Sequence, residues 1–207
     1  MQKLNDLEAA AIDQQGEEEK GQEVPPHWNT SFFTVDYVDQ IAAKAKETGA
    51  TVIFGPMDVF NAGRMAMIQD PQEAMFAVWQ PKAHIGVRIK GETGALMWNE
   101  LMTTESVDAT QFYSGLLGMD SSKMPGPIDY TMLNVGGTNV VGVMAITEEM
   151  GPVPPHRMVY FGVDDVDAAA QNAESLGGSI VVPPADIPEI GRFAGLKDPP
   201  TCDVLHF

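Results

Sequence analysis

Cysteine is almost absent from this chain, whose 207 residues include only Cys202. A single cysteine cannot form an internal disulfide, so a reducing compartment is expected. The first residues, 1–8, contain no apolar stretch of the kind that defines a secretory signal. No hydrophobic run approaches the length of a membrane span. The sequence therefore predicts a cytoplasmic protein that does not contact membranes.

Basic residues are also scarce, with 12 Lys and Arg against 29 Asp and Glu and a formal net charge of −17. A surface this negative repels nucleic acid and anionic lipid, so neither is an expected partner. It tolerates or attracts a cationic partner. The plainer interpretation is an acidic surface with no particular partner.

Several catalytic motifs are missing as well. The sequence has no phosphate-binding loop, no recognisable Ser-His-Asp arrangement and no paired-cysteine motif. Hydrophobic residues make up 44% of the chain, which is ordinary for a globular protein with a substantial core.

What the chain does have is an internal repeat. Val24-Pro25-Pro26-His27 recurs 129 residues later as Val153-Pro154-Pro155-His156, and Val35–Asp39 recurs 128 residues later as Val163–Asp167. A near-constant offset over a long segment indicates duplicated structural units. Two further pairs at the 128-residue offset are Gly63-Arg64 with Gly191-Arg192 and Asp70-Pro71 with Asp198-Pro199.

Each unit has the pattern of a strand, an amphipathic helix and three further strands. Apolar residues at Val166, Ala169, Ala170 and Ala173 define one face of a helix. The same spacing occurs in the other two units, at Val38, Ile41, Ala42 and Ala45 and at Ala109, Phe112, Tyr113 and Leu116. Predicted N-caps are Asp36 and Asp164, and predicted helix stops are Gly49 and Gly177. The fold class is therefore α+β, built from βαβββ modules that must pair to bury their sheets.

The repeat also predicts the domain organisation. Residues 1–80 form an incomplete first domain, with a strand remnant at 1–23 and a module at 24–80. Residues 81–95 form a linker. Residues 96–207 form a complete second domain, with modules at 96–149 and 153–207. The first strand, helix and second strand of the opening module are absent from the sequence.

These residues carry a family resemblance. Trp98–Thr104, Phe112-Tyr113 and Leu116-Leu117-Gly118 resemble the first strand and helix of a vicinal-oxygen-chelate module. Tyr160–Asp167 and Gly191–Ala194 are similar to the second module of such a pair. The chain thus resembles the glyoxalase, bleomycin-resistance and extradiol dioxygenase superfamily, and most of all its two-domain glyoxalase-like members. The resemblance implies that two modules pair into a curved, mixed, mostly antiparallel sheet around a cleft, with the helices outside. It is weakly specific for activity, because this fold hosts many chemistries.

The resemblance also indicates where a metal site would lie. Metal-dependent members carry a His, Glu or Gln on the first strand of each module and a Glu near the end of the last strand. The matching positions in this sequence are Trp98, Met158, Thr30, Leu205 and Ala77. These residue types do not make a divalent-metal site. No cofactor is therefore predicted.

Strand alternation gathers five residues into a candidate ligand site. If Trp98 faces the cleft of the second domain, so does Glu100; if Met158 faces it, so do Tyr160 and His156. One interpretation is a mostly apolar pocket with a few polar groups. The other is that Trp98 and Met158 fill a closed core. An inward carboxylate needs a reason, which favours a functional role for Glu100.

The remaining candidates have plainer explanations. His27 and His156 each follow Pro-Pro and are expected to bond to backbone, although a two-histidine metal site stays open. Arg64 and Arg192 are expected to pair with carboxylates such as Asp58 and Asp186, with anion recognition as the alternative.

Two functions follow from these observations. The first is metal-independent binding of a small amphipathic or aromatic molecule in the cleft of the second domain. The second is a lyase or dioxygenase with an unconventional divalent-metal site involving Glu100 and His156. Because the first module is incomplete, its partner module is expected to expose an edge and an apolar face, which predicts a homodimer.

Overall fold

The computed structural model describes residues 1–12, 14–21, 26–29, 32–126, 128–199 and 203–206. The chain forms two compact units. One unit contains residues 1–28, 87–98 and 158–207, and the other contains residues 29–86 and 99–157. Strands β7 and β11 each continue from one unit into the other.

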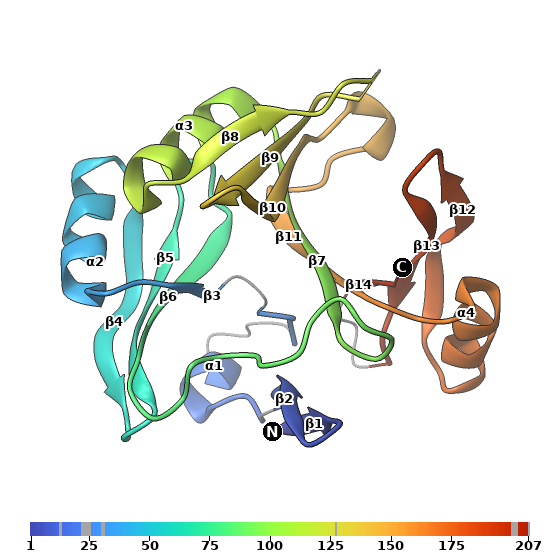
Figure 1. Cartoon of the computed structure of the whole chain (residues 1–207), viewed down its shortest axis with the longest axis horizontal. Helices are drawn as coiled ribbons and strands as arrows, with labels where there is room; N and C mark the ends of the chain where they lie inside the picture. Colours follow the sequence, from blue (N-terminus) through green and yellow to red (C-terminus); the bar gives the residue numbers. More distant parts are fainter. Residues whose placement is uncertain (13, 22–25, 30–31, 127, 200–202, 207) are drawn as a thin grey trace. The chain divides into compact units, whose positions relative to one another are not determined.

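Three modules share one topology. In each, the first strand pairs in parallel with the last, and the sheet order is first, fourth, third, second strand. The module after residue 31 contains β3 (Phe32–Thr34), α2 (Val38–Glu47), β4 (Thr51–Val59), β5 (Gly63–Gln69) and β6 (Met75–Pro81), with the order β3-β6-β5-β4. Figure 1 shows α2 alongside this sheet.

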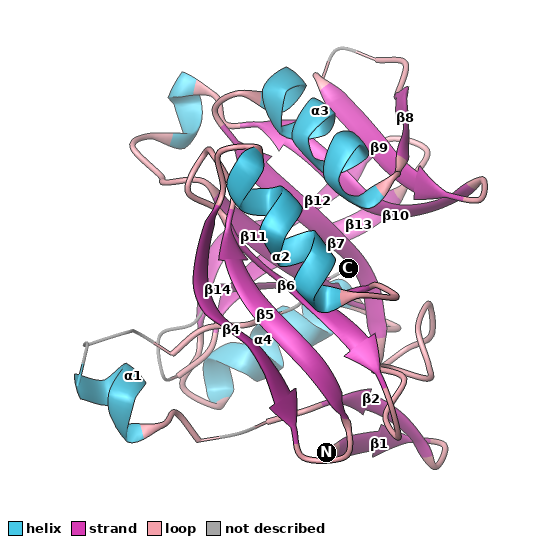
Figure 2. Ribbon diagram, turned by 90° about the vertical axis from the view of Figure 1, so that its left-hand side faces the viewer, coloured by secondary structure: helices cyan, strands magenta, loops and turns pink. Residues whose placement is uncertain are grey.

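The other two modules follow the same plan. One contains β7 (Leu96–Thr103), α3 (Ser106–Leu117), β8 (Asp120–Lys123), β9 (Tyr130–Val135) and β10 (Thr138–Ala145), ordered β7-β10-β9-β8. The other contains β11 (His156–Phe161), α4 (Val166–Ser175), β12 (Ser179–Ile187), β13 (Gly191–Lys197) and β14 (Asp203–His206), ordered β11-β14-β13-β12. The α+β class with βαβββ modules is confirmed, and Figure 2 separates its strands from its helices by colour.

The strand register reproduces the sequence repeat. Phe33 lies opposite Val78 in the first of these modules, and Phe161 lies opposite His206 in the last, each shifted by 128 residues. At the start, β1 (Gln2–Leu4) and β2 (Leu7–Ala10) form an antiparallel hairpin, which fits the predicted strand remnant. The remaining helical segments are α1 (Glu17–Gly21) and the 3-10 turn η1 (Glu148–Met150).

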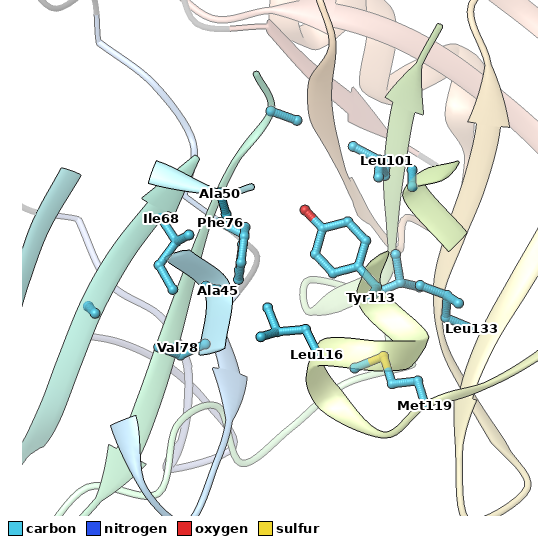
Figure 3. Packing of buried hydrophobic residues seen from close by; sticks show 14 of the residues in the cluster. Ala45, Ala50, Ile68, Phe76, Val78, Leu101, Tyr113, Leu116, Met119 and Leu133 are labelled. Atoms are coloured by element: carbon cyan, nitrogen blue, oxygen red, sulfur yellow. The ribbon is translucent and has the colours of Figure 1, made fainter. Parts of the chain in front are cut away.

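The largest core lies in the unit that contains α2 and α3. Their predicted apolar faces are buried there, together with the inward residues of both sheets. Figure 3 shows the ring of Tyr113 in this cluster, with Phe76 on one side and Leu101 and Leu133 on the other. Phe76, Leu101, Leu133 and Tyr113 have no solvent exposure. Burial of these large side chains is what holds two modules together in one unit.

The helix ends differ in part from the prediction. Gly49 and Gly177 do follow their helices, with φ angles of 91° and 93° that suit glycine. The predicted N-caps are wrong by one residue. Asp165 caps α4 by accepting from the Ala168 N–H, while Asp164 accepts from the Thr93 hydroxyl. Local spacing alone does not distinguish two adjacent aspartates.

The N-terminus of α2 is satisfied from a distant residue. Its N-cap is Tyr37 rather than Asp36, and no side-chain cap forms there. Instead the Val38 N–H donates to Oε1 of Gln80, 42 residues further along the chain. An orphan amide at a helix start can be satisfied by any nearby acceptor, so this cap depends on tertiary structure.

Both predicted arginine pairs are confirmed. Arg64 Nη1 lies 3.3 Å from Asp58 Oδ1, and Arg192 Nη1 lies 3.0 Å from Asp186 Oδ1. Each guanidinium also binds a second carboxylate, which lies in the first turn of the helix of the same module. Arg64 donates from Nε and Nη2 to Asp39, and Arg192 does the same to Asp167, at 2.6 to 2.9 Å. The sequence analysis missed these stronger, two-bond partners.

The segment predicted as a linker is partly buried. Ile89 and Ala95 form a small core with Ala9 of β2, and the Arg88 N–H donates to the Glu8 carbonyl. Each compact unit combines segments that are far apart in the sequence. The predicted domains, in contrast, are consecutive stretches of the chain. The domain prediction therefore stays a prediction. No helix in the described part of the chain is long and apolar enough to cross a membrane.

Candidate functional site

Glu100 is positioned by the alternation of β7. Leu101 points to the face of the sheet covered by α3, where it joins the core. Glu100 therefore points to the opposite face. It is 6% exposed, which makes it one of the few buried carboxylates in the described chain. A buried carboxylate is costly unless it is hydrogen-bonded or paired, so its surroundings are informative.

Tyr130 supplies a hydrogen bond to this carboxylate. Its hydroxyl donates to Glu100 Oε2 at 2.7 Å. Tyr130 is on β9, Glu100 is on β7, and β10 lies between the two strands. The phenol therefore crosses the middle strand to reach the acid.

Gly142 makes this crossing possible. It lies on β10 directly opposite Glu100 on β7 and Met132 on β9. A Cβ atom at position 142 would overlap the phenol ring and hydroxyl of Tyr130. Any other residue there would force the tyrosine away from the carboxylate. Three strands thus contribute to one arrangement: an acid, a glycine and a hydroxyl donor.

The rest of this sheet face is rich in methionine. Met144 lies opposite Met102 on β7 and Tyr130 on β9, and Met132 lies opposite Gly142. Met132 and Met144 are half-buried, and Met102 is buried. Thioether side chains are flexible and make favourable contacts with aromatic rings. We call this surface, formed by Glu100, Met102, Tyr130, Met132, Gly142 and Met144, the methionine face.

The other predicted site residues are distributed over both units. Trp98 is half-buried on β7, and Met158 and Tyr160 are buried on β11; all three belong to the unit with β12, β13 and β14. Glu100 and His156 belong to the unit with α2 and α3. The five residues are thus divided between the two units, and the five-residue surface stays a prediction.

His156 has the structural contact that its position predicts. Its Nδ1 lies 2.8 Å from the carbonyl oxygen of Pro154. Because a carbonyl only accepts, the Nδ1 atom carries the donated proton in this contact. The expectation of a histidine bonded to backbone at the start of a strand is confirmed.

The family's metal-ligand positions do not fit a divalent metal in this chain. Trp98 offers an indole that only donates, Met158 a weak thioether acceptor, and Ala77 no donor atom. Thr30 lies outside the described residues, as does the side chain of Leu205. Within the described ranges, no group of three or more His, Cys, Asp and Glu is placed to hold a metal ion.

A second buried polar cluster lies on the helix-covered side of the same unit. The Tyr113 hydroxyl donates to Asp70 Oδ2 at 2.7 Å, and Asp70 Oδ1 accepts from the backbone N–H groups of Gln72 and Ala74. Arg157 lies over the Tyr113 ring, 4.9 Å from its centroid. Burial raises the pKa of the Tyr113 hydroxyl far above its usual value; the charge of Arg157 opposes this rise and the charge of Asp70 adds to it.

The sequence analysis missed the members of both clusters except Glu100. A signal was available for Gly142, because a glycine inside a strand often marks a close approach of another group. Tyr130 could be identified only once β9 and β10 were in register. Asp70 was noticed only as part of the repeated Asp-Pro pair, and its role as the acceptor for Tyr113 follows from packing between two modules.

Comparison with known proteins shows the family. Residues 95–201 match the profile of the Glyoxalase/Bleomycin resistance protein/Dioxygenase superfamily. The chain belongs to this superfamily, and its fold is the vicinal-oxygen-chelate fold.

Two relatives are similar over most of the chain. It is 42% identical over 178 residues to the putative glyoxylase CFP32 of Mycobacterium tuberculosis (strain CDC 1551 / Oshkosh), covering 85% of this chain and 67% of that protein. It is 38% identical over 181 residues to the anthracycline biosynthesis protein DnrV of Streptomyces peucetius, covering 85% of this chain and 63% of that one. The chain thus spans about two thirds of the length of these relatives.

Solved structures agree on the fold. The Mn(II)-bound glyoxalase from Novosphingobium aromaticivorans matches with a TM-score of 0.57 at 18% identity, over 84% of this chain and 60% of that one. The 2,2',3-trihydroxybiphenyl 1,2-dioxygenase from Sphingomonas wittichii strain RW1 matches with a TM-score of 0.56 at 15% identity, over 87% and 68%. At this identity the likeness concerns the fold alone.

Proposed function

We propose that this chain binds a small amphipathic or aromatic molecule on the methionine face, without a metal ion. The observation that carries the proposal is the bond from Tyr130 to Glu100 across Gly142. It places one oriented carboxylate within a surface of thioethers. A ligand site has this composition when apolar contacts supply affinity and a few polar groups fix orientation.

Two further observations support the proposal. Met102, Met132 and Met144 supply polarizable side chains that adapt to flat rings. The name of one relative, an anthracycline biosynthesis protein, agrees with an aromatic ligand. The residues at the family's metal-ligand positions argue against the metal-dependent alternative, in which Glu100 and His156 would hold the ion.

The binding test uses the methionine methyl groups as reporters. The chain has 13 methionines, which can be labelled with carbon-13 and assigned by substitution with leucine. Titration with 1-naphthalenemethanol should shift the methyl signals of Met102, Met132 and Met144 saturably. The signals of Met57 and Met75, which are exposed on the other sheet of this unit, should not move. Equal shifts everywhere, or none, would refute the proposal.

Metal independence is tested on the same protein. Elemental analysis of the purified chain should find no stoichiometric zinc, nickel, iron or manganese, and the titration should be unchanged by a chelator. Stoichiometric metal that is lost in the Glu100→Ala variant would favour the alternative of a lyase or dioxygenase.

We also propose a cytoplasmic location and a homodimer. The single Cys202 supports the first, because a chain without internal disulfides suits a reducing compartment. The outer strand β4 supports the second. It ends its sheet and exposes Ile53, Phe54 and Met57 to solvent.

A further inference from the structure

A pocket of about 330 Å³ lies beside the first turn of α2, in the unit that contains α2 and α3. This volume is within the range of small-molecule sites. Figure 2 shows α2 and α3 side by side. Lys44 of α2 joins the two helices by donating to the carbonyl groups of Gly115 and Leu116 near the end of α3. The pocket shares no residue with the methionine face.

The wall of the pocket is apolar and belongs to the core. It is formed by Val35, Ile41 and Leu117, which are half-buried and pack against the large core cluster of this unit. Side chains packed into a dense interior keep one arrangement. The shape of the wall is therefore set before a ligand arrives, which lowers the cost of binding.

The rim of the pocket is polar and has no basic side chain. It is formed by the exposed residues Thr34, Asp36 and Gln40, together with Tyr37. A carboxylate accepts hydrogen bonds, whereas a hydroxyl and an amide both donate and accept. An anion does not suit this rim or a chain with a net charge of −17. Because Asp36 is exposed, water and salt screen its charge, and charge alone gives a cation little affinity. The rim suits a neutral ligand with several hydroxyl groups.

Tyr37 occupies a position where the repeat has a helix cap. At the equivalent position of the last module, 128 residues later, Asp165 caps α4. Tyr37 makes no side-chain cap and is 60% exposed. This tyrosine thus lacks the stabilisation that an aspartate provides at a helix start, and it leaves a large ring in water. Residues that break a local rule of stability are expected at functional sites, and this one lines the pocket.

We propose that this pocket binds a neutral hexopyranose, either free or as the sugar of a glycoside. One side of such a ring carries C–H groups, which pack against an aromatic face such as that of Tyr37. Its hydroxyl groups both donate and accept, which satisfies the side chains of Asp36 and Gln40. The site is separate from the methionine face, so this proposal goes beyond the proposed function.

The test titrates the full chain with D-glucose, D-galactose, D-mannose and their methyl β-glycosides. The chain has four tyrosines, whose ring signals can be labelled with carbon-13 and assigned with phenylalanine variants. At least one sugar should shift the Tyr37 signal saturably, and the signal of the fully buried Tyr113 should not move. Binding of a glycoside identifies a sugar carried by a larger molecule, and binding of a free hexose alone identifies the monosaccharide. Cyclohexanemethanol has a six-membered ring without ring hydroxyls and should bind about tenfold or more weakly, because it leaves the rim unpaired.

Two variants copy the last module, which has Asp165 and Ala168 where this module has Tyr37 and Gln40. Tyr37→Asp removes the ring and adds a cap, so it should weaken sugar binding about tenfold or more while it raises the thermal midpoint. Gln40→Ala should weaken binding about fivefold, the usual effect of one hydrogen bond. The matched control is Gln111→Ala, which changes an exposed glutamine of α3 outside the pocket and should keep the affinity.

The proposal is wrong if no sugar shifts the Tyr37 signal, or if cyclohexanemethanol binds as tightly as the sugars. Sugar binding that survives in Tyr37→Asp, or that falls equally in Gln40→Ala and Gln111→Ala, would place the ligand elsewhere and overturn it too. A lower thermal midpoint for Tyr37→Asp would show that the tyrosine serves stability instead of binding. These results leave the methionine face untouched, because its test follows the signals of Met102, Met132 and Met144.

Discussion

At the scale of single residues, alternation along a strand predicts direction but not partners. It is enough to put Glu100 and Leu101 on opposite faces of β7. The partner of Glu100 is Tyr130, 30 residues away, and the contact requires Gly142 on the strand between them. No local pattern contains this arrangement, because it depends on the register of three strands.

Asp70 and Tyr113 make a similar long-range contact inside the core, and it leads to a stability prediction. Asp70 is 3% exposed and Tyr113 is fully buried. Tyr113→Phe removes one donor and leaves Asp70 Oδ2 without the hydroxyl in a dry environment. The free energy of unfolding should fall by about 1–3 kcal/mol, the usual cost of leaving a buried acceptor unpaired. Urea denaturation measures this difference.

The matched control is Tyr37→Phe. Tyr37 is 60% exposed, so water replaces its hydroxyl contacts and stability should hardly change. Equal losses in the two variants would show that the bond to Asp70 contributes nothing specific.

At the scale of elements, periodicity predicted the helices well and their ends less well. The apolar spacing of α2, α3 and α4 is a property of each segment, because one face must be buried whatever covers it. The hydrogen-bond partners of the helix ends come from other elements of the fold. Gln80 serves α2 from the end of β6, and Lys44 of α2 donates to the Gly115 carbonyl near the end of α3.

The clusters around Arg64 and Arg192 also belong to the scale of elements, and they predict how the stability of the protein depends on pH. Hydrogen bonds from Arg64 and Arg192 hold the pKa values of Asp39 and Asp167 below the ordinary 3.8. A lowered folded-state pKa stabilises the protein above the unfolded value, and the stabilisation is lost as the pH falls through the folded value. Arg192→Gln should therefore lower the thermal midpoint near neutral pH, and this deficit should shrink as the pH falls below the ordinary carboxyl pKa.

Thermal unfolding of Arg192→Gln and Arg64→Gln across this pH range tests the prediction. Both carboxylates are exposed, so the loss near neutral pH should be smaller than that of Tyr113→Phe. Because the clusters around Arg64 and Arg192 are equivalent, the two variants should lose thermal stability over the same pH range. A deficit that persists undiminished at about pH 2 would assign the role of the arginines to packing instead.

At the scale of the whole molecule, the repeat governs the architecture. Three modules have the same strand order, and two of them have the same register at a 128-residue offset. The equivalent outer strands β4 and β12 each expose apolar side chains. Ile53 on β4 is 53% exposed, and its equivalent on β12, Val181, is 58% exposed.

The proposed homodimer is tested at this scale by light scattering. Wild type should have twice the mass of one chain, and Ile53→Glu should shift it toward the monomer, because a buried unpaired charge opposes association. Val181→Glu makes the same kind of change on the equivalent strand of the other unit and should leave the dimer intact. A wild-type protein that is monomeric at all concentrations would end this proposal.

The sequence by itself determined the repeated module, the apolar faces of its helices and the family. These features follow from periodicity and spacing, which a chain carries in any conformation. Register, packing across modules and the pairing of buried polar groups were decided only by the tertiary structure. Residues such as Tyr130, Gly142 and Asp70 acquire their roles from neighbours distant in sequence. Glu100 was predicted as an inward acid from alternation alone, whereas its orientation by a phenol across a glycine required three strands to come together.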